Sequence, residues 1–230
     1  MVNMTDPNQP QKYRLRLVFA KKKEIKYISH LDLVLAWERA LRRAQIPMAY
    51  SQGFNPRPKM QFASGLPLGT TGSQELMDII VTEPVDLEAA LPRIRAALPV
   101  GIGLSSIRQV PLKAPALQPL VHRAEYTVLV ETDLPPDELS NRIERLLAAE
   151  EIIQIRRRRK KEERFDLRPS LHQLELENTA DGEARLRMCV TAGQKGNLRP
   201  EAVLKALGLA DNWAEIERTR LIFADEVGEE

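Results

Sequence analysis

The chain has 230 residues, of which 43% are hydrophobic and 29% are charged, which predicts a globular protein with an apolar core. Its formal net charge of +2 is nearly neutral, so the overall charge does not by itself point to a nucleic-acid partner. The single cysteine, Cys189, excludes an internal disulfide and any multi-cysteine metal or cluster site. No apolar run approaches the roughly 20 residues that span a bilayer, so we expect no membrane partner. The single cysteine and the polar N-terminus, which has no signal-peptide apolar core, predict a cytoplasmic protein.

The first predicted elements are a strand and a capped helix. Residues 1–12 are polar and are expected to form a flexible lead. Residues 13–20 alternate apolar and basic side chains, which is typical of a half-buried strand. A helix is predicted from about residue 31 to 45, with Ser29 as its N-cap and Asp32 in its first turn. The residues expected to form its apolar face are Leu31, Val34, Leu35, Trp37, Leu41 and Ala44.

The predicted elements follow the order β-α-β-β-α-β twice along the chain. Strands at 59–64 and 74–82, a helix that Asp86 caps, and a strand at 101–110 complete a β-α-β-β-α-β series. Three prolines between 111 and 119 then predict a linker. The second half shows the same order with an additional strand or loop, in strands at 122–131, 152–159, 171–177, 184–191 and 213–223 and helices at 136–149 and 200–207.

Two consecutive split β-α-β units predict an α+β fold, with two tandem ferredoxin-like (β-α-β-β-α-β) domains that have antiparallel sheets. We expect the first domain at 13–110 and the second at 121–224. A Pro-rich linker at 111–120 would join them, and an acidic tail at 225–230 would follow.

The segment 50–59, YSQGFNPRPK, is the candidate functional surface. Its turn formers exclude a regular element, and it combines aromatic, amide and basic side chains, as proteins that hold single-stranded RNA do. The alternative is a rigid structural loop, and we expect Phe54 to pack in the core. Three segments supply the predicted RNA-binding residues, which are Arg39, Arg42 and Arg43 on the helix, Tyr50, Gln52, Asn55, Arg57 and Lys59 in the loop, and Arg156, Arg158, Lys160 and Arg168 farther along the chain.

The last of these segments contains six consecutive basic residues, 156–161. Alternate strand residues point to opposite faces, and both faces cannot be core, so a protruding basic hairpin is predicted. The hairpin would contact RNA phosphates or an acidic protein, or it would be a solvated edge that protects the sheet from aggregation. Asp166 is expected to pair with Arg168 or with a neighbouring arginine.

His30 is the one candidate for acid-base catalysis. Some double ferredoxin-fold proteins, such as CRISPR repeat-processing endoribonucleases, use a histidine as general base on an RNA 2′-hydroxyl, and His30 could have that role. The alternative is a histidine that packs at the start of the helix. His122 and His172 belong to no metal-ligand spacing, so we expect no metal and no cofactor.

The segments SHLDL, RALRRA, YSQGFNPRPK and LPLG, between Ser29 and Gly69, resemble a bacterial family called radical SAM-linked proteins. That family is an uncharacterised domain encoded beside, or fused to, a radical SAM protein. The resemblance covers residues 13 to about 223 and implies a radical SAM protein as partner. Where the family often has a histidine between the two prolines, this chain has Arg57, so no histidine catalysis is expected there.

A radical SAM enzyme holds its iron–sulfur cluster with three closely spaced cysteines, and this chain has only Cys189. The chain is therefore not the radical enzyme. We predict an accessory protein that binds RNA or presents a substrate to a radical SAM enzyme, in tRNA or rRNA modification. Two alternatives remain open, an endoribonuclease that uses His30 and a protein–protein adaptor that binds no RNA.

Overall fold

The computed structural model describes residues 11–158, 161–194 and 196–226, apart from the side chains of residues 156–158 and 161. The chain divides into two compact units, and each is described by itself. Unit 1 extends to Leu68 and resumes from Glu75 to Leu117. Unit 2 contains Gly69–Gln74 and continues from Gln118.

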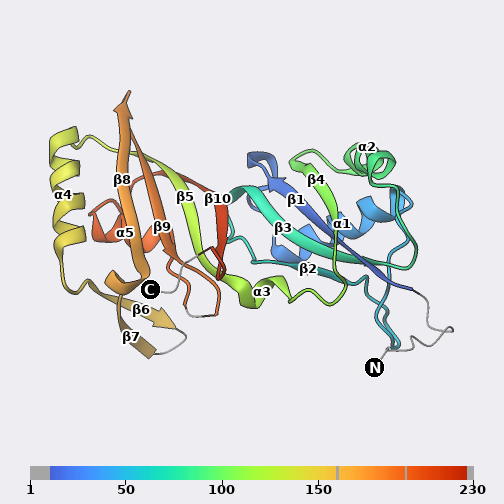
Figure 1. Ribbon diagram of the computed structural model, residues 1–230. Coiled ribbons are helices and arrows are strands. Elements are labelled where there is room, and N and C mark those ends of the chain that lie inside the picture. Colours follow the sequence, from blue (N-terminus) through green and yellow to red (C-terminus); the bar gives the residue numbers. More distant parts are fainter. Residues whose placement is uncertain (1–10, 159–160, 195, 227–230) are drawn as a thin grey trace. The chain divides into compact units, whose positions relative to one another are not determined.

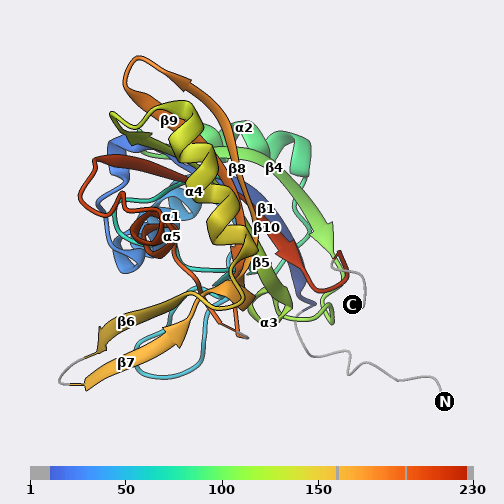
Figure 2. The ribbon, with the colours of Figure 1, turned by 90° about the vertical axis from the view of Figure 1, so that its left-hand side faces the viewer.

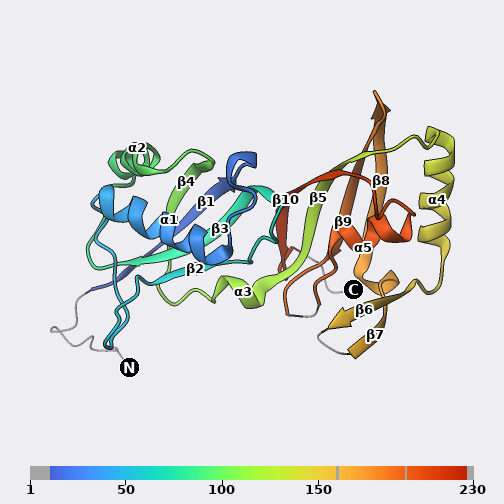
Figure 3. The same cartoon turned by 180° about the vertical axis from the view of Figure 1, so that it is seen from behind.

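Unit 1 is a small antiparallel sheet with two helices (Figure 1). The strand order is β4-β1-β3, with β2 on the other side of β3, and the β1–β4 and β2–β3 pairs are antiparallel. Figure 3 shows α1 in front of this sheet, along one of its faces. The elements are β1 (Tyr13–Lys21), the 3-10 turn η1 (Lys23–Ile25), α1 (His30–Arg43), β2 (Met60–Phe62), β3 (Thr71–Val81), α2 (Leu87–Ala97) and β4 (Ile102–Val110).

The core of unit 1 lies between the sheet and its helices. Alternate residues of β1 are buried, and Phe19 among them meets Trp37 of α1 edge to face at 5.4 Å between ring centroids. Phe19 also meets Phe62 of β2 at 5.7 Å in the same geometry. Each such pair contributes about 0.5–1.5 kcal/mol beyond the burial of apolar area. These contacts hold α1 against β1 and β2.

The N-terminus of α1 has the predicted cap. Ser29 Oγ accepts a hydrogen bond from the Asp32 N–H at 3.2 Å, and the Asp32 carboxylate accepts from the Ser29 N–H at 3.3 Å, which forms a capping box. α2 is likewise capped by Asp86, as predicted.

The predicted apolar face of α1 is wrong in part. Trp37, Leu41 and Ala44 are buried, but Leu31 is 73% exposed and Leu35 is also exposed. Successive helical residues are about 100° apart, so positions two residues apart face nearly opposite directions. The buried stripe consists of Leu33, Trp37, Ala40, Leu41 and Ala44.

Unit 2 is a second antiparallel sheet with the strand order β10-β5-β9-β8. On the side of β10 that faces away from β5, Thr71 and Gly72 of the 69–74 segment pair in parallel with Glu217 and Arg218. The elements are α3 (Leu117–Leu120), β5 (Val121–Glu131), α4 (Pro136–Ala148), β6 (Ile153–Arg158), β7 (Lys161–Asp166), the 3-10 turn η2 (Arg168–Ser170), β8 (Leu171–Ala180), β9 (Glu183–Thr191), α5 (Pro200–Ala206) and β10 (Ala214–Phe223).

The predicted hairpin is confirmed as β6–β7, which forms a two-stranded sheet of its own (Figure 2). In the backbone register Arg156 lies opposite Glu163, and Arg158 lies opposite Lys161. Lys160 and the side chains of Arg156 and Arg158 lie outside the described residues, so their predicted RNA contacts stay predictions.

The predicted mixed α+β class with a mostly antiparallel sheet is confirmed. The Pro-rich stretch that was predicted as a linker contains the short helix α3. Most of the predicted lead and of the acidic tail, residues 1–10 and 227–230, lies outside the described residues.

Candidate nucleic-acid interface

The segment 50–59, hereafter the 50–59 loop, has a hydrogen-bonded base. The Ser51 N–H donates to the Arg57 carbonyl at 2.8 Å, and the Arg57 N–H donates to Ser51 Oγ at 2.9 Å. One step closer to the sheet, the Lys59 N–H donates to the Ala49 carbonyl at 2.8 Å. The Ala49 N–H in turn donates to the Ile80 carbonyl of β3 at 2.8 Å. The base of the loop is therefore an ordered extension of the β2–β3 sheet.

The tip of the loop presents a bare aromatic ring. Phe54 has 107% of its reference exposure, so the prediction that it packs in the core is wrong. Residues 52–56 extend beyond the hydrogen-bonded base of the loop, which keeps the Phe54 ring out of the core. Tyr50, at the base, is 44% exposed. Gly53 has φ 129 with open space where a Cβ would lie, so its backbone conformation is what favours glycine there.

The cations near the loop fall into two groups. Arg57, Lys59 and Arg39 are exposed, and in the described part of the chain no hydrogen bond or ion pair engages their side chains. Arg42 donates to Glu38 Oε1 at 2.9 Å, and the Arg43 guanidinium donates to the Ala97 carbonyl at the end of α2. The first group is available to an anionic ligand, whereas Arg43 stabilises the packing of α1 against α2. The predicted amide contacts, Gln52 and Asn55, are exposed at the tip.

A groove of about 490 Å³ lies between α1 and the returning arm of the loop. We call it the α1 groove. Its surface is mainly apolar, and the sequence interpretation missed it because two helical stripes were merged into one. Residues 31, 35, 38 and 42 follow a spacing of three and four, which could have separated this stripe from the buried one. The groove is lined by Leu31, Val34, Leu35, Glu38, Arg57, Pro58 and Met60.

His30 is exposed at the start of α1, and its ring contacts one core residue. Its ring meets Phe62 edge to face, with 5.2 Å between centroids and an interplanar angle of 79°. Among the described residues, none forms a hydrogen bond with its side chain. A general base is normally oriented by such a bond, so this geometry matches the packing interpretation of His30.

Arg168, in unit 2, is engaged with the main chain. Its Nε and Nη2 donate to the Leu147 carbonyl at 3.2 and 2.9 Å, and Nη1 donates to the Leu171 carbonyl at 2.9 Å. Asp166 accepts from the Arg168 N–H at 2.9 Å and from the Ile152 N–H at 2.7 Å. The guanidinium therefore stabilises the last turn of α4, and we do not include it in the interface.

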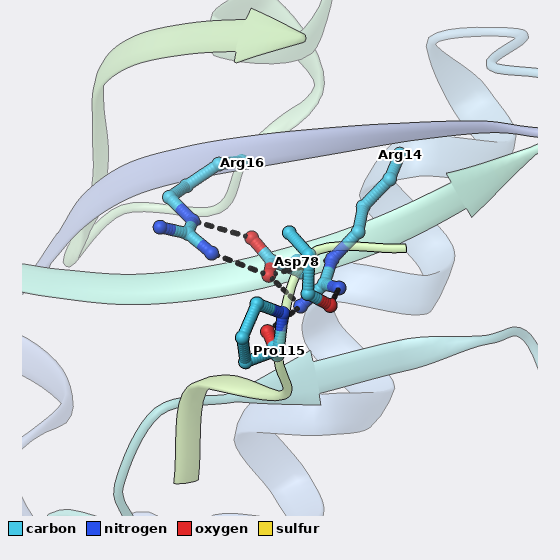
Figure 4. A network of polar contacts seen from close by, with 5 residues as sticks. Arg14, Arg16, Asp78 and Pro115 are labelled. Carbon is cyan, nitrogen blue, oxygen red and sulfur yellow. Dashed lines mark hydrogen bonds and ion pairs between the residues drawn. The ribbon is translucent and has the colours of Figure 1, made fainter. Parts of the chain in front are cut away.

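A buried charge network in unit 1 was not predicted (Figure 4). The Asp78 carboxylate of β3 accepts from Arg14 Nε at 2.9 Å and from Arg16 Nε at 2.8 Å. Arg14 also donates to the Pro115 carbonyl at 2.9 Å and to the Ala114 carbonyl. The alternation of β1 places both arginines on one face, but their partner is distant in sequence. The network attaches the Pro-rich stretch to the sheet.

The cysteine and the possible metal ligands indicate no second reactive site among the described residues. Burial raises the pKa of the Cys189 thiol, so this cysteine is less reactive than an exposed one. In the part of the chain that the structure describes, no cluster of three or more His, Cys, Asp or Glu side chains could hold a metal ion. No helix within the same residues is long and apolar enough to cross a membrane.

These features define an α+β protein of two compact units, with an ordered loop that exposes aromatic and basic side chains. The chain belongs to the bacterial family described as "Uncharacterized protein conserved in bacteria (DUF2344)", whose model matches residues 14–200. No curated protein matches the sequence.

Among solved structures, a chain of a Cbf5–Nop10–Gar1 complex aligns with a TM-score of 0.50 and 16% identity, over 89% of this chain and 48% of that one. An H/ACA RNP bound to a substrate RNA containing 2′-deoxyuridine aligns with a TM-score of 0.46 and 17% identity, over 89% and 47%. The archaeal box H/ACA Nop10–Cbf5 complex gives 0.46 and 15%, over 88% and 47%. This chain thus spans about half the length of these proteins, and the first likeness concerns the fold alone.

Proposed function

We propose that this protein binds single-stranded RNA through the 50–59 loop of unit 1. The observation that carries the proposal is the full exposure of Phe54 on a loop whose base is fixed by hydrogen bonds. A large apolar ring in water is unfavourable unless a ligand covers it. Unpaired nucleobases stack on such rings. Because hydrogen bonds fix the foot of the loop, the ring is held in place and binding avoids the entropy cost of ordering a flexible loop.

The other side chains of the loop suit the remaining parts of a nucleotide. Arg57 and Lys59 are exposed cations that would contact phosphates, and Arg39 extends this positive surface along α1. Gln52 and Asn55 would donate to and accept from base edges, and Tyr50 offers a second stacking surface. Stacking requires bases that are not already paired, so a single strand is favoured over a duplex.

The test is fluorescence anisotropy of a labelled single-stranded RNA with the wild-type protein and two variants. Phe54→Ala should weaken binding about 5- to 150-fold, because base–aromatic stacking contributes about 1–3 kcal/mol. Its exposure means that folding should be unaffected. Arg57→Ala/Lys59→Ala should reduce the slope of log K against log salt by about 0.7 for each phosphate that the variant no longer neutralises.

The matched control is Arg108→Ala/Lys113→Ala, which removes two exposed cations from the same unit, Arg108 being on the opposite edge strand, β4. This variant should bind RNA as the wild type does. No binding of single-stranded RNA at low salt would overturn the proposal and would favour the protein adaptor. An equally weakened affinity in both double variants would show non-specific attraction to charge.

Two finer proposals accompany this one. The resemblance to radical SAM-linked proteins supports a radical SAM enzyme as partner, to which this chain would present RNA. The pairing of strands supports a ferredoxin-like domain in each unit, since the first strand pairs with the last and the third with the second. In unit 2 this order is β10-β5-β9-β8, with the β6–β7 hairpin as an insertion. We propose that the units are two such domains.

A further inference from the structure

The α1 groove contains a carboxylate among apolar side chains. The Glu38 side chain is only 16% exposed, and its Oε1 accepts from Arg42 Nη2 at 2.9 Å. Among the described residues, none donates a hydrogen bond to Oε2. Oε2 keeps contact with solvent, because Trp37 Nε1 is the only fully buried side-chain nitrogen or oxygen without a partner among the described residues. This oxygen is therefore open to a ligand, and a carboxylate oxygen accepts hydrogen bonds from N–H donors. A ligand of this groove should therefore combine apolar faces with N–H donors.

Two kinds of ligand have these properties, a basic side chain of another protein and a nucleobase. The charges around the groove decide between them. Arg57 lines it, and Arg42 contacts Glu38 at 2.9 Å, so Glu38 is an acid beside two cations. These cations repel a basic peptide and attract a phosphate. The charge pattern thus matches a nucleotide, whose base carries the donors and whose phosphate carries the negative charge.

The arrangement of donors on the base decides which nucleotide fits. The Watson–Crick edge of guanine has two adjacent donors, N1–H and the N2 amino group, which match the two oxygens of a carboxylate. Adenine and cytosine have one amino donor beside a ring nitrogen that accepts. Uracil has one N3–H between two carbonyl oxygens, which the carboxylate repels. Guanine is therefore the best partner for Glu38.

We propose that the α1 groove is a subsite for one unpaired guanine of the RNA, with Glu38 as the specificity determinant. The proposal rests on the RNA binding proposed above and names the base that the same surface selects. Leu31 and Leu35 of α1 would cover one face of the ring, and Pro58 and Met60 the other. The volume of about 490 Å³ lies within the range of about 300–1,000 Å³ of small-molecule sites. The hydrogen bond of the Arg57 N–H to Ser51 fixes that backbone at the groove.

The experiment compares two labelled strands, an oligouridine and the same strand with one central guanosine. The wild-type protein should bind the guanosine strand about tenfold more tightly, since a bidentate contact with a base contributes about 1–3 kcal/mol of discrimination. In Glu38→Gln the ratio of the two affinities should fall to near one, because a carboxamide presents one donor and one acceptor to two donors. A strand with inosine, which lacks the N2 amino group, should bind the wild type with intermediate affinity.

The control is Glu138→Gln, which removes a carboxylate from the equivalent helical pair with Arg142 on α4. It should leave the preference for guanosine unchanged. Equal binding of both strands by the wild type, or a preference that persists in Glu38→Gln, would overturn the subsite. If oligouridine binding still depended on Phe54, Arg57 and Lys59, the proposed function would stand without it. If neither strand bound, both proposals would be overturned.

Discussion

Asp78 shows how a single buried residue organises unit 1. Its carboxylate contacts two guanidinium groups, and Arg14 continues to the carbonyl groups of Ala114 and Pro115. All three charged side chains are largely buried, with 7% exposure for Arg14, 16% for Arg16 and 2% for Asp78. Because two cations share one anion, the arginines depend on Asp78 more than it depends on either of them.

Replacing Asp78 by asparagine should destabilise the protein by about 3–5 kcal/mol, since it leaves two buried cations without a counter-ion. Urea unfolding measured by circular dichroism would report this as a lower midpoint. Asp211→Asn, which changes the same group at an exposed position, is the control and should be neutral. An unchanged midpoint in Asp78→Asn would show that the network contributes little to stability.

Two residues of the proposed binding surface have unusual burial for their type. Phe54 is exposed although its type favours burial, and Glu38 is mostly buried although its type favours exposure. Both depart from the usual rule in the same part of unit 1. These two departures support the binding surface that we propose, because local exceptions to the burial rule are typical of functional sites.

Among the secondary-structure elements, α1 combines two surfaces. Its buried stripe, which includes Trp37 and Leu41, packs in the core, while its second stripe, which includes Leu31 and Leu35, lines the groove. The helix starts at His30, and Leu31 in its first turn lines the groove. The cap that starts the helix therefore affects both stability and the groove.

Ser29→Ala should lower the free energy of unfolding by about 1 kcal/mol, within a range of about 0.5–2 kcal/mol, because the Asp32 N–H loses its acceptor. Urea unfolding gives the stability change, and hydrogen exchange of the first-turn amides should become faster. Ser106→Ala, at an exposed position of β4, serves as the comparison and should change neither quantity. Unaltered exchange at Asp32 would mean that the capping box does not hold the first turn.

At the scale of the whole molecule, the two units are not two continuous stretches of the chain. The 69–74 segment lies between two parts of unit 1 in sequence but belongs to unit 2. There Thr71 Oγ1 donates to the Ile216 carbonyl at 3.3 Å, and the main chain pairs with Glu217 and Arg218 of β10. A fragment that begins after the Pro-rich stretch would leave this side of β10 unpaired.

We therefore expect a fragment of residues 118–230 to be less stable than the same region in the full chain and to self-associate through β10, because an open edge strand pairs with other chains. Light scattering and urea unfolding would measure both effects. Joining residues 69–74 to the fragment through a flexible linker should partly restore a monomer. A bare fragment that is monomeric and as stable as the full chain would contradict this assignment.

Most of the longer helices and strands could be predicted from the amino-acid sequence, because their signals are local, whereas the short helix α3 and the strand β7 were not predicted. The alternation on β1, the Ser29 and Asp86 caps and the turn-rich 50–59 loop all depend on residues within one or two turns of each other. The mixed α+β class followed from the order of these elements. The two stripes of α1 are also visible in the local periodicity. Which stripe is buried, however, depends on the element against which the helix packs.

Which side chains are available to a ligand depends instead on tertiary packing. Whether Phe54 is core or tip, whether Arg168 faces solvent or the end of α4, and whether Glu38 lines a groove all depend on segments distant in sequence. The partner of Arg14 and Arg16 lies more than 60 residues away along the chain, at Asp78. Burial and pairing are properties of packing between elements, and no local pattern records which elements will meet.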